Sequence, residues 1–138
     1  QICWEMHFPE VSTIYSLKGA EIIFAPHASP AIIGNRKEIW LKYMTARAYA
    51  NSVFVAGCNL IGDNGHGICF GGGCLVIDPK GRVIGEDFSG QEGMLTVQLS
   101  SEEINKIRYQ ERKSMADSFY LEYRRPELYT DLLGKINK

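Results

Sequence analysis

Hydrophobic and polar positions follow two different periods along this chain, so helix-like and strand-like segments alternate. Apolar residues recur at helical spacing in residues 9–18 and 37–51. Continuous apolar runs, which are typical of strands buried on both faces, occur at residues 21–25 and 53–61. The first half of the chain therefore predicts helix, strand, helix and strand in that order.

The second half predicts a hairpin, a further strand and a helix. The sequence Asp-Pro-Lys-Gly at residues 78–81 has the residue types of a tight turn and joins the β-rich runs 74–77 and 82–85. Residues 94–99 alternate between apolar and polar positions like a strand. A helix is expected from a serine cap at residues 100–101, with acidic residues in its first turn, to about residue 116.

These elements predict a mixed α/β layered fold, because the turn at residues 78–81 makes its two strands antiparallel. The helices can cover one face of the sheet, and the other face needs cover from outside this chain. We expect residues 1–118 to form the C-terminal part of one domain and residues 119–138 to form an aromatic and basic tail.

Composition narrows the classes of function. The chain has 138 residues, a formal net charge of -1, and 45% hydrophobic and 22% charged residues, which is typical of a globular protein without a basic field for nucleic acid or anionic lipid. No apolar run approaches the roughly 20 residues that span a bilayer. We therefore expect a cytoplasmic protein with neither nucleic acid nor membrane as its partner.

Four cysteines in a chain of this length predict free thiols in a reducing compartment. Together with His66, the residues Cys58, Cys69 and Cys74 have the chemistry of zinc ligands. However, they do not form a CxxC pair, and strand alternation would place Cys69 and Cys74 on opposite faces. We expect no metal and no cofactor.

Cys3 is the strongest candidate for chemistry, because the pattern places it at the end of a predicted strand, at the mouth of a turn and two residues from Glu5. A thiolate can act as a nucleophile. A carboxylate beside a thiol raises the pKa of the thiol, so Glu5 does not activate Cys3 alone and another base and a cation are needed. On the residues alone, the favoured interpretation of Cys3 is an inert, small apolar core residue, which is common for a free cysteine.

Two further segments have alternative interpretations. His27 follows the strand at residues 21–25 and is either part of a ligand-binding loop or an exposed loop histidine. The glycine-rich stretch 62–67 lacks the GxxxxGK[ST] pattern of a phosphate loop and predicts a plain connection.

Taken together, the order and spacing of several short motifs resemble the nitrilase (carbon-nitrogen hydrolase) superfamily over nearly the whole chain. The motifs are Cys3-Trp4-Glu5 with Phe8-Pro9-Glu10, Gly19-Ala20-Glu21-Ile22-Ile23 with Pro26, Trp40 with Ala46-Arg47-Ala48 and Asn51, Phe54-Val55 with Asn59, Phe70 with Gly72, Asp78-Pro79 with Gly81, and Arg124-Arg125-Pro126-Glu127-Leu128-Tyr129.

The resemblance implies half of an α-β-β-α sandwich and hydrolysis of non-peptide carbon-nitrogen bonds in small amides, N-carbamoyl amines or nitriles through a cysteine thioester. Cys3 then takes the role of nucleophile, and the backbone N–H of Trp4 binds the oxyanion. Substrate-binding positions are expected at Glu5, His27, Ala28 and Ser29.

In the family, the glutamate and lysine partners of the nucleophile precede the cysteine. The chain starts two residues before Cys3 and not with methionine, so we expect both partners to lie upstream of it and the 138 residues alone to be inactive.

Assembly is also implied by the resemblance. We expect a homo-oligomer, or a companion chain that carries the N-terminal half, with the tail 119–138 packing on a partner subunit. Two alternatives remain open: a glutaminase module of an ammonia-using synthetase, and an inactive truncated or split subunit with a structural or binding role.

Overall fold

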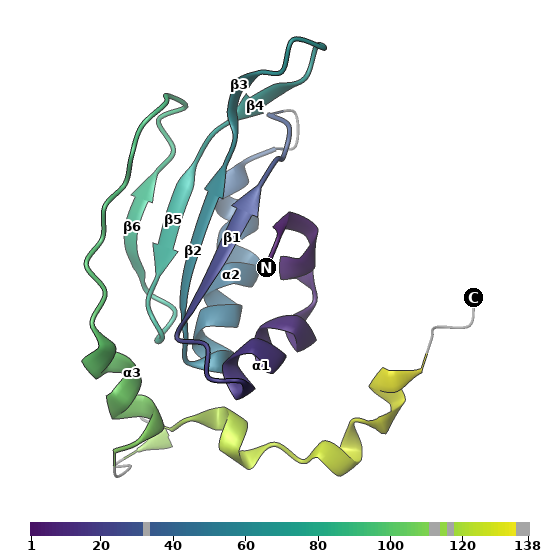
Figure 1. The fold of residues 1–138 in the computed structure, drawn as a ribbon, viewed down its shortest axis with the longest axis vertical. Coiled ribbons are helices and arrows are strands. Elements are labelled where there is room, and N and C mark those ends of the chain that lie inside the picture. The colour runs from purple at the N-terminus through teal and green to yellow at the C-terminus, as the bar shows by residue number, and fades with distance from the viewer. Residues whose placement is uncertain (32–33, 111–113, 116–117, 135–138) are drawn as a thin grey trace.

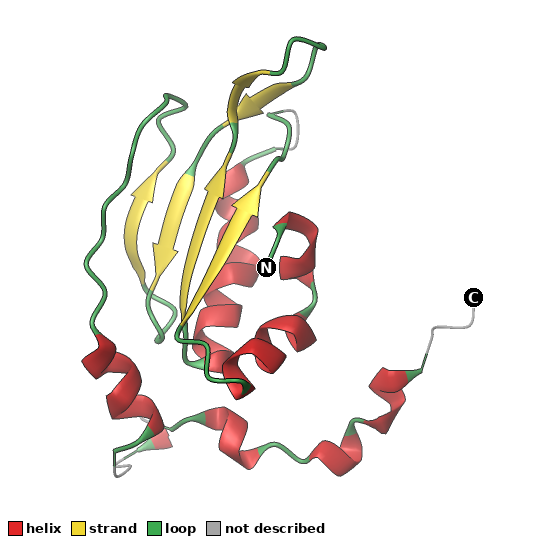
Figure 2. Cartoon of the chain, viewed as in Figure 1, coloured by secondary structure: helices red, strands yellow, loops and turns green. Residues whose placement is uncertain are grey.

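The computed structural model describes residues 1–31, 34–110, 114–115 and 118–134, and it places a four-stranded sheet against two helices (Figures 1 and 2). The sheet has the order β1-β2-β5-β6. Its strands are β1 (Ile22–His27), β2 (Phe54–Asn59), β5 (Cys74–Ile77) and β6 (Val83–Asp87). The helices are α1 (Pro9–Leu17), α2 (Arg36–Asn51) and α3 (Ser101–Arg108), and a separate hairpin contains β3 (Ile61–Asp63) and β4 (Cys69–Gly71).

The sheet is mixed, which confirms the predicted fold class. Strand β1 runs parallel to β2, whereas β2 and β5, and β5 and β6, are antiparallel. The predicted turn between β5 and β6 is present: the Gly81 N–H donates to the Asp78 carbonyl at 2.9 Å, and Gly81 has a φ of 78°. Glycine adopts this left-handed conformation without the penalty that a side chain would impose.

Helices α1 and α2 cover one face of the sheet (Figure 1). Helix α2 begins after Asn35, whose side chain accepts a hydrogen bond from the Glu38 N–H at 3.3 Å and caps the helix. The side chains of the core are fully or almost fully buried between α2 and the strands. They include Trp40, Met44 and Ala48 from α2 and Ile23, Ala25, Val55, Leu75 and Ile77 from the sheet.

The opposite face of β1 is open, so the prediction that this strand is buried on both faces is wrong for the described chain. Burial alternates along β1, and Phe24 is 64% exposed while Ala25 is fully buried. The strand also continues through Pro26 to His27, beyond its predicted end at residue 25. Strand β1 lies at the edge of the sheet. An edge strand tolerates proline, because a backbone nitrogen that faces away from the neighbouring strand does not need to donate a hydrogen bond.

Two other predicted boundaries also change. The predicted strand at residues 53–61 is two strands, because β2 ends at Asn59 and β3 belongs to the separate hairpin. The predicted helix at residues 100–116 ends at Arg108; residues 111–113 and 116–117 lie outside the described residues.

The predicted strand at residues 94–99 is wrong, because the segment joins no β-ladder. Its alternate apolar side chains serve packing: a Cβ atom added at Gly85 of β6 would meet Val97 at 2.5 Å and Leu95 at 3.4 Å. Alternating apolar and polar residues thus indicate that one face of a segment packs on the protein, but they do not show that the segment pairs with another strand.

The predicted C-terminal tail forms short 3-10 helices at Tyr120–Tyr123, Pro126–Leu128 and Thr130–Leu133 (Figure 1). Its arginines are engaged within the tail: Arg125 pairs with Glu127 at 2.8 Å, and the Arg124 guanidinium lies 5.3 Å from the centre of the Tyr129 ring. No helix in the described parts of the chain is long and apolar enough to cross a membrane.

Arg108 fastens α3 to the rest of the fold. Its side chain is almost fully buried, and its Nη2 atom donates to Ser16 Oγ at 3.2 Å, to the Ala20 carbonyl at 2.6 Å and to the Ser52 carbonyl at 3.2 Å. The guanidinium also lies 5.2 Å from the centre of the Phe119 ring. One cation therefore joins four separate segments of the chain.

Replacing Arg108 by alanine should lower the free energy of unfolding by about 2–4 kcal/mol, because buried acceptors lose their donor. Urea denaturation of the wild type and the variant measures this loss. Arg125→Ala is the matched control: its side chain is 67% exposed and pairs with Glu127, and such surface pairs contribute only about 0–1 kcal/mol. Equal losses in the two variants would contradict the role of Arg108.

Candidate active site

Cys3 lies in a 3-10 turn formed by Cys3–His7, not at the end of a strand as predicted. Residues 1–2 join no strand, although the amino group of Gln1 donates to the Phe24 carbonyl of β1 at 2.9 Å. Cys3 has a φ of 45° and, with Ser52, is one of two described non-glycine residues with positive φ. Such strained backbone is found preferentially at functional sites, where the surrounding structure maintains it.

The turn is fixed from both ends. The Glu5 carboxylate accepts a hydrogen bond from the Ile2 N–H at 2.7 Å, so this side chain caps the turn. At the other end, Met6 is fully buried, and Arg47 of α2 donates to the Met6 carbonyl at 3.2 Å and to the His7 carbonyl at 3.1 Å. Helix α2 therefore determines where Cys3 is held.

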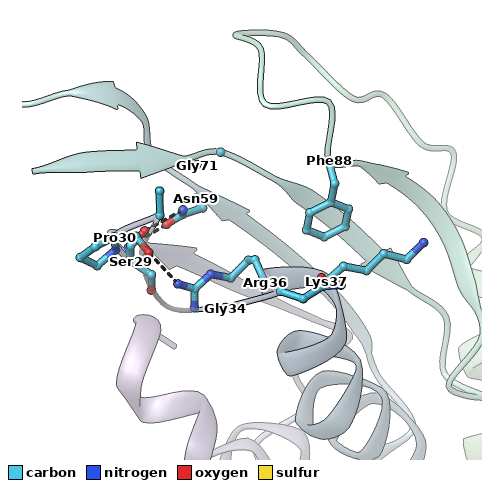
Figure 3. Close-up of a pocket in the computed structure, with 11 residues that line it drawn as sticks. Ser29, Pro30, Gly34, Arg36, Lys37, Asn59, Gly71 and Phe88 are labelled. Carbon is cyan, nitrogen blue, oxygen red and sulfur yellow. Dashed lines mark hydrogen bonds between the residues drawn. The ribbon is translucent and has the colours of Figure 1, made fainter.

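Ser29 lies next to the candidate nucleophile, with 3.7 Å between Cys3 Sγ and Ser29 Oγ. Ser29 is itself held by Asn59 at the end of β2. The Ser29 N–H donates to Asn59 Oδ1 at 2.8 Å, and Asn59 Nδ2 donates to the Ser29 carbonyl at 3.1 Å (Figure 3). This pair of hydrogen bonds fixes the backbone beyond β1 at the position where it meets Cys3.

The other predicted site residues are distributed around this point. Trp4 is 69% exposed, and its ring stacks on His7 at 4.9 Å. Its backbone N–H donates to no acceptor in the described parts of the chain, so this donor beside Cys3 is available. Ala28 is exposed, and Glu5 is occupied in capping the turn. The roles predicted for these three residues stay predictions.

His27 is the last residue of β1 and is 6% exposed, so its interpretation as an exposed loop histidine is wrong. Its Nδ1 atom lies 2.8 Å from the Ala25 carbonyl, which can only accept a hydrogen bond. Nδ1 therefore carries the proton, and Nε2 accepts from the Tyr43 hydroxyl at 3.4 Å. Tyr43 entered the sequence analysis only as an apolar position of a helix, which gave no signal of this contact.

Burial sets the ionisation of this pair. Burial lowers the pKa of His27, with smaller contributions from the positive charges of Arg36 and His7, while its bond to the Ala25 carbonyl acts in the opposite direction. Burial raises the pKa of Tyr43 to about 12. The fold thus favours a neutral imidazole and a protonated phenol behind Cys3.

A cavity of about 260 Å³ extends from Ser29 along the start of α2 (Figure 3). It brings together the ends of β1 and β2, the loop before α2 and the residue that follows β6. The lining residues are Ser29, Pro30, Ala31, Gly34, Asn35, Arg36, Lys37, Asn59, Gly71, Gly72 and Phe88. Of the predicted site residues, Ser29 lines this cavity, whereas Cys3 lies outside the lining and reaches it only through its 3.7 Å contact with Ser29. His27 does not line the cavity either.

The candidate zinc ligands do not form a metal site in the described residues, which contain no group of three or more suitable side chains. Cys58 and Cys74 are paired across β2 and β5, and all four cysteines carry free thiols. Burial and the neighbouring Cys58 raise the pKa of the Cys74 thiol, which opposes the thiolate form that zinc requires.

Comparison with known proteins identifies the family of the chain. The sequence profile of the carbon-nitrogen hydrolase family matches residues 1–109, so the chain belongs to this family. Its sheet with helices on one face corresponds to part of the nitrilase-type fold.

Two curated relatives are amidases. 2-Oxoglutaramate amidase from Bacillus subtilis is 35% identical over 107 residues, which cover 78% of this chain and 39% of the relative. N-carbamoylputrescine amidase from Arabidopsis thaliana is 33% identical over 143 aligned positions, which cover 96% of this chain and 46% of the relative. The chain therefore spans less than half the length of these relatives.

Among solved structures, the amidase from Nesterenkonia sp. AN1, of the nitrilase superfamily, superposes with a TM-score of 0.71 at 28% identity. The match covers 94% of this chain and 41% of the amidase chain. That structure contains the acetamide moiety of fluoroacetamide added covalently at the active-site cysteine.

We predict that His27 titrates below the ordinary histidine pKa of about 6.5. At a pH between the lowered pKa of His27 in the folded chain and its ordinary pKa in the unfolded chain, the unfolded chain binds more protons. The free energy of unfolding therefore falls as the pH drops below about 6.5. The test compares the melting temperature against pH for the wild type and His27→Gln. The variant should lose less stability on acidification, whereas the exposed His66→Gln control should lose as much as the wild type. Identical curves for all three proteins would contradict the prediction.

Proposed function

We propose that this chain provides the nucleophile and part of the substrate pocket of an amidase that acts on small, non-peptide carbon-nitrogen substrates. The observation that carries the proposal is the position of Cys3: a cysteine on strained backbone, 3.7 Å from Ser29 and beside a cavity, in a chain of the carbon-nitrogen hydrolase family. The covalent adduct on the active-site cysteine of the Nesterenkonia amidase supports the assignment of Cys3.

In the proposed reaction, the thiolate of Cys3 attacks the amide carbon and forms a tetrahedral adduct. The backbone N–H of Trp4 donates to the developing oxyanion, because it is adjacent to the nucleophile and has no other described acceptor. Protonation of the nitrogen and cleavage of the carbon-nitrogen bond release ammonia and leave a thioester on Cys3. Water then adds to the thioester, and cleavage of the carbon-sulfur bond releases the carboxylic acid and restores the thiol.

Proton transfer needs partners that we place outside these residues. In the described parts of the chain, the only hydrogen-bonding group beside the Cys3 thiol is the Ser29 hydroxyl, which is a poor base. A carboxylate base and an ammonium group from a further segment or a companion chain would complete the site. We therefore expect the 138 residues alone to be inactive.

The cavity and the relatives support particular classes of substrate. A volume of about 260 Å³ suits a short acyl chain, which fits an amide, an N-carbamoyl amine or a nitrile of few carbons. The relatives named as 2-oxoglutaramate and N-carbamoylputrescine amidases support the first two of these classes.

Cys3→Ser should abolish amide hydrolysis by the protein as its gene encodes it, because an unactivated hydroxyl is a far weaker nucleophile than a thiolate. Ammonia release from short aliphatic amides measures the loss, which we expect to exceed about a thousandfold. Mass spectrometry after treatment with fluoroacetamide should locate a single adduct on the peptide that contains Cys3.

Cys58→Ser is the matched control, since Cys58 is an exposed thiol in β2, one residue before Asn59, and alternation directs it to the other face of the sheet. This variant should keep wild-type hydrolysis. Ammonia release that persists in Cys3→Ser would rule out Cys3 as the nucleophile.

We also propose that the C-terminal tail packs on a partner subunit. The side chains of Leu128, Leu132 and Leu133 are 60%, 63% and 89% exposed on short 3-10 helices that extend away from the sheet (Figure 1). Apolar residues in such a row are typical of an interaction surface. The start of the tail is anchored to its own body, where the Tyr120 and Tyr49 hydroxyls lie 2.6 Å apart.

Replacing Leu128, Leu132 and Leu133 together by serine should reduce the native mass of the protein, because the proposed contact loses its apolar side chains. Light scattering coupled to size-exclusion chromatography measures the mass of the assembly. Leu60→Ser, a change of a 54% exposed leucine outside the tail, serves as the control. An unchanged mass in the triple variant would exclude the tail as an assembly contact.

A further inference from the structure

The cavity beside Cys3 carries positive charge and no negative charge among the described residues that line it. Arg36 and Lys37 are its charged lining residues, and no aspartate or glutamate belongs to the lining. A cleft lined by one sign of charge concentrates ligands of the opposite sign. The charge of this cavity therefore bears on which substrates can occupy it.

The two cations differ in what they already bind. Lys37 Nζ pairs with Glu86 Oε1 at 2.6 Å, so its charge is balanced. Arg36 has a single hydrogen bond in the described structure, from Nη2 to the Pro30 carbonyl at 3.3 Å, and it has no carboxylate partner. A guanidinium has five N–H donors and suits the two oxygens of a carboxylate, so most of the binding capacity of Arg36 is unused.

The field of Arg36 reaches the interior of the site. Its positive charge contributes to the lowered pKa of His27 and acts to lower that of Tyr43, the pair that lies behind Cys3. Arg36 is also the first residue of α2, where the helix dipole adds to its positive potential. An anion held by Arg36 would thus sit at the positive end of the same small site.

The walls of the cavity define the rest of the ligand. Ser29 and Asn59 form a polar end next to Cys3, while Pro30 and Phe88 supply apolar surface, and Arg36 reaches toward Pro30 (Figure 3). The Arg36 guanidinium lies at the same end as Ser29, because it bonds the carbonyl of the neighbouring Pro30. This arrangement suits a short ligand whose reactive amide lies at Ser29 and whose charged group, only a few carbons away, lies at Arg36.

We propose that Arg36 binds a carboxylate of the substrate and makes the enzyme select short amides that carry a carboxylate over neutral or cationic amides. The inference rests on the proposed function for the hydrolytic step, but the anion site itself does not require that step. Arg36 acts here as a specificity residue and takes no part in bond cleavage.

Succinamate and butyramide form a matched pair of substrates, since both have four carbons and differ in a carboxylate in place of a methyl group. In the protein as its gene encodes it, kcat/KM should favour succinamate, and 4-aminobutyramide should be the poorest of the three. Arg36→Gln should lower kcat/KM for succinamate on the order of 10–100-fold, as expected for loss of a charged hydrogen bond. The same variant should change kcat/KM for butyramide by less than about twofold. Arg36→Lys should recover part of the succinamate activity, because it restores charge without the planar fork.

Lys42→Gln is the control, because Lys42 is an exposed cation on the same helix and outside the cavity lining. It should leave the preference for succinamate intact. A drop of equal size for both substrates in Arg36→Gln, or no drop for either, would overturn the inference. The first result would assign Arg36 a structural role or a carboxylate partner from another part of the protein.

A binding experiment separates this inference from the proposed function. Isothermal titration of succinate into the Cys3→Ala protein needs no turnover, and Arg36→Gln in that background should weaken binding by a similar factor. If no amide is hydrolysed but succinate binding depends on Arg36, the proposed function fails and the anion site stands. If amides are hydrolysed through Cys3 and neither succinate binding nor substrate preference depends on Arg36, the function stands and the anion site is wrong.

Discussion

The close approach of α2 to the sheet at Gly57 is the contact on which the rest of the structure depends. A Cβ atom at this position would lie 2.8 Å from Met44 Cε, closer than real Cβ contacts, and 3.1 Å from Met44 Sδ, so the end of the Met44 side chain would have to move. Because Gly57 has no side chain, Trp40 and Met44 pack directly on β2 and become fully buried. The same placement of α2 brings its first residue, Arg36, to the cavity and brings Arg47 under the turn that carries Cys3. The geometry of the site therefore follows from a core contact that takes no part in its chemistry.

Aromatic and imidazole rings connect the nucleophilic turn to the wall of the cavity. Two rows of ring contacts meet where the Tyr43 hydroxyl donates to His27 Nε2. The rows are Trp4–His7–Tyr43, with centroids 4.9 and 4.7 Å apart, and His27–Trp40–Phe88, with centroids 4.7 and 5.8 Å apart. Rings have few rotatable bonds, so this arrangement holds its shape at a small loss of entropy. Burial of His27 in this arrangement disfavours its protonated form, and its bond to the Ala25 carbonyl fixes one tautomer of the imidazole.

Elements with local signals could be predicted from the sequence, and features that depend on contacts between distant segments could not. Helix α2 was predicted to within one residue of its start, and the Asp78–Gly81 turn was predicted in full, because periodicity and turn residues act within a few positions. The segment at residues 94–99 has the pattern of a strand, but its apolar side chains pack over Gly85 and no neighbour offers it a ladder. At the candidate site, a short motif predicted Cys3 as the nucleophile, and this role stays a prediction. The positions of Arg36 at the cavity and of Tyr43 beside His27 were not predicted. Arg36 ends a loop and Tyr43 is one aromatic residue of a helix, and neither context indicates which distant side chain the residue will contact in the fold.

The charges around Cys3 suggest how the proposed reaction is divided between segments. Ser29, His27, Tyr43 and Arg36 supply a hydroxyl, an imidazole whose protonation burial disfavours, a phenol with a pKa of about 12 and a guanidinium. The Glu5 carboxylate of the same turn accepts the Ile2 N–H and caps the turn. These groups are suited to binding and orientation. In the proposed reaction the base comes from a further segment or a companion chain, and the described chain leaves an apolar face of the sheet uncovered, on which Phe24 of β1 is 64% exposed. Burying that face is favourable for any segment that packs there, so in this proposal the packing energy of the open sheet helps to position the base against the thiol.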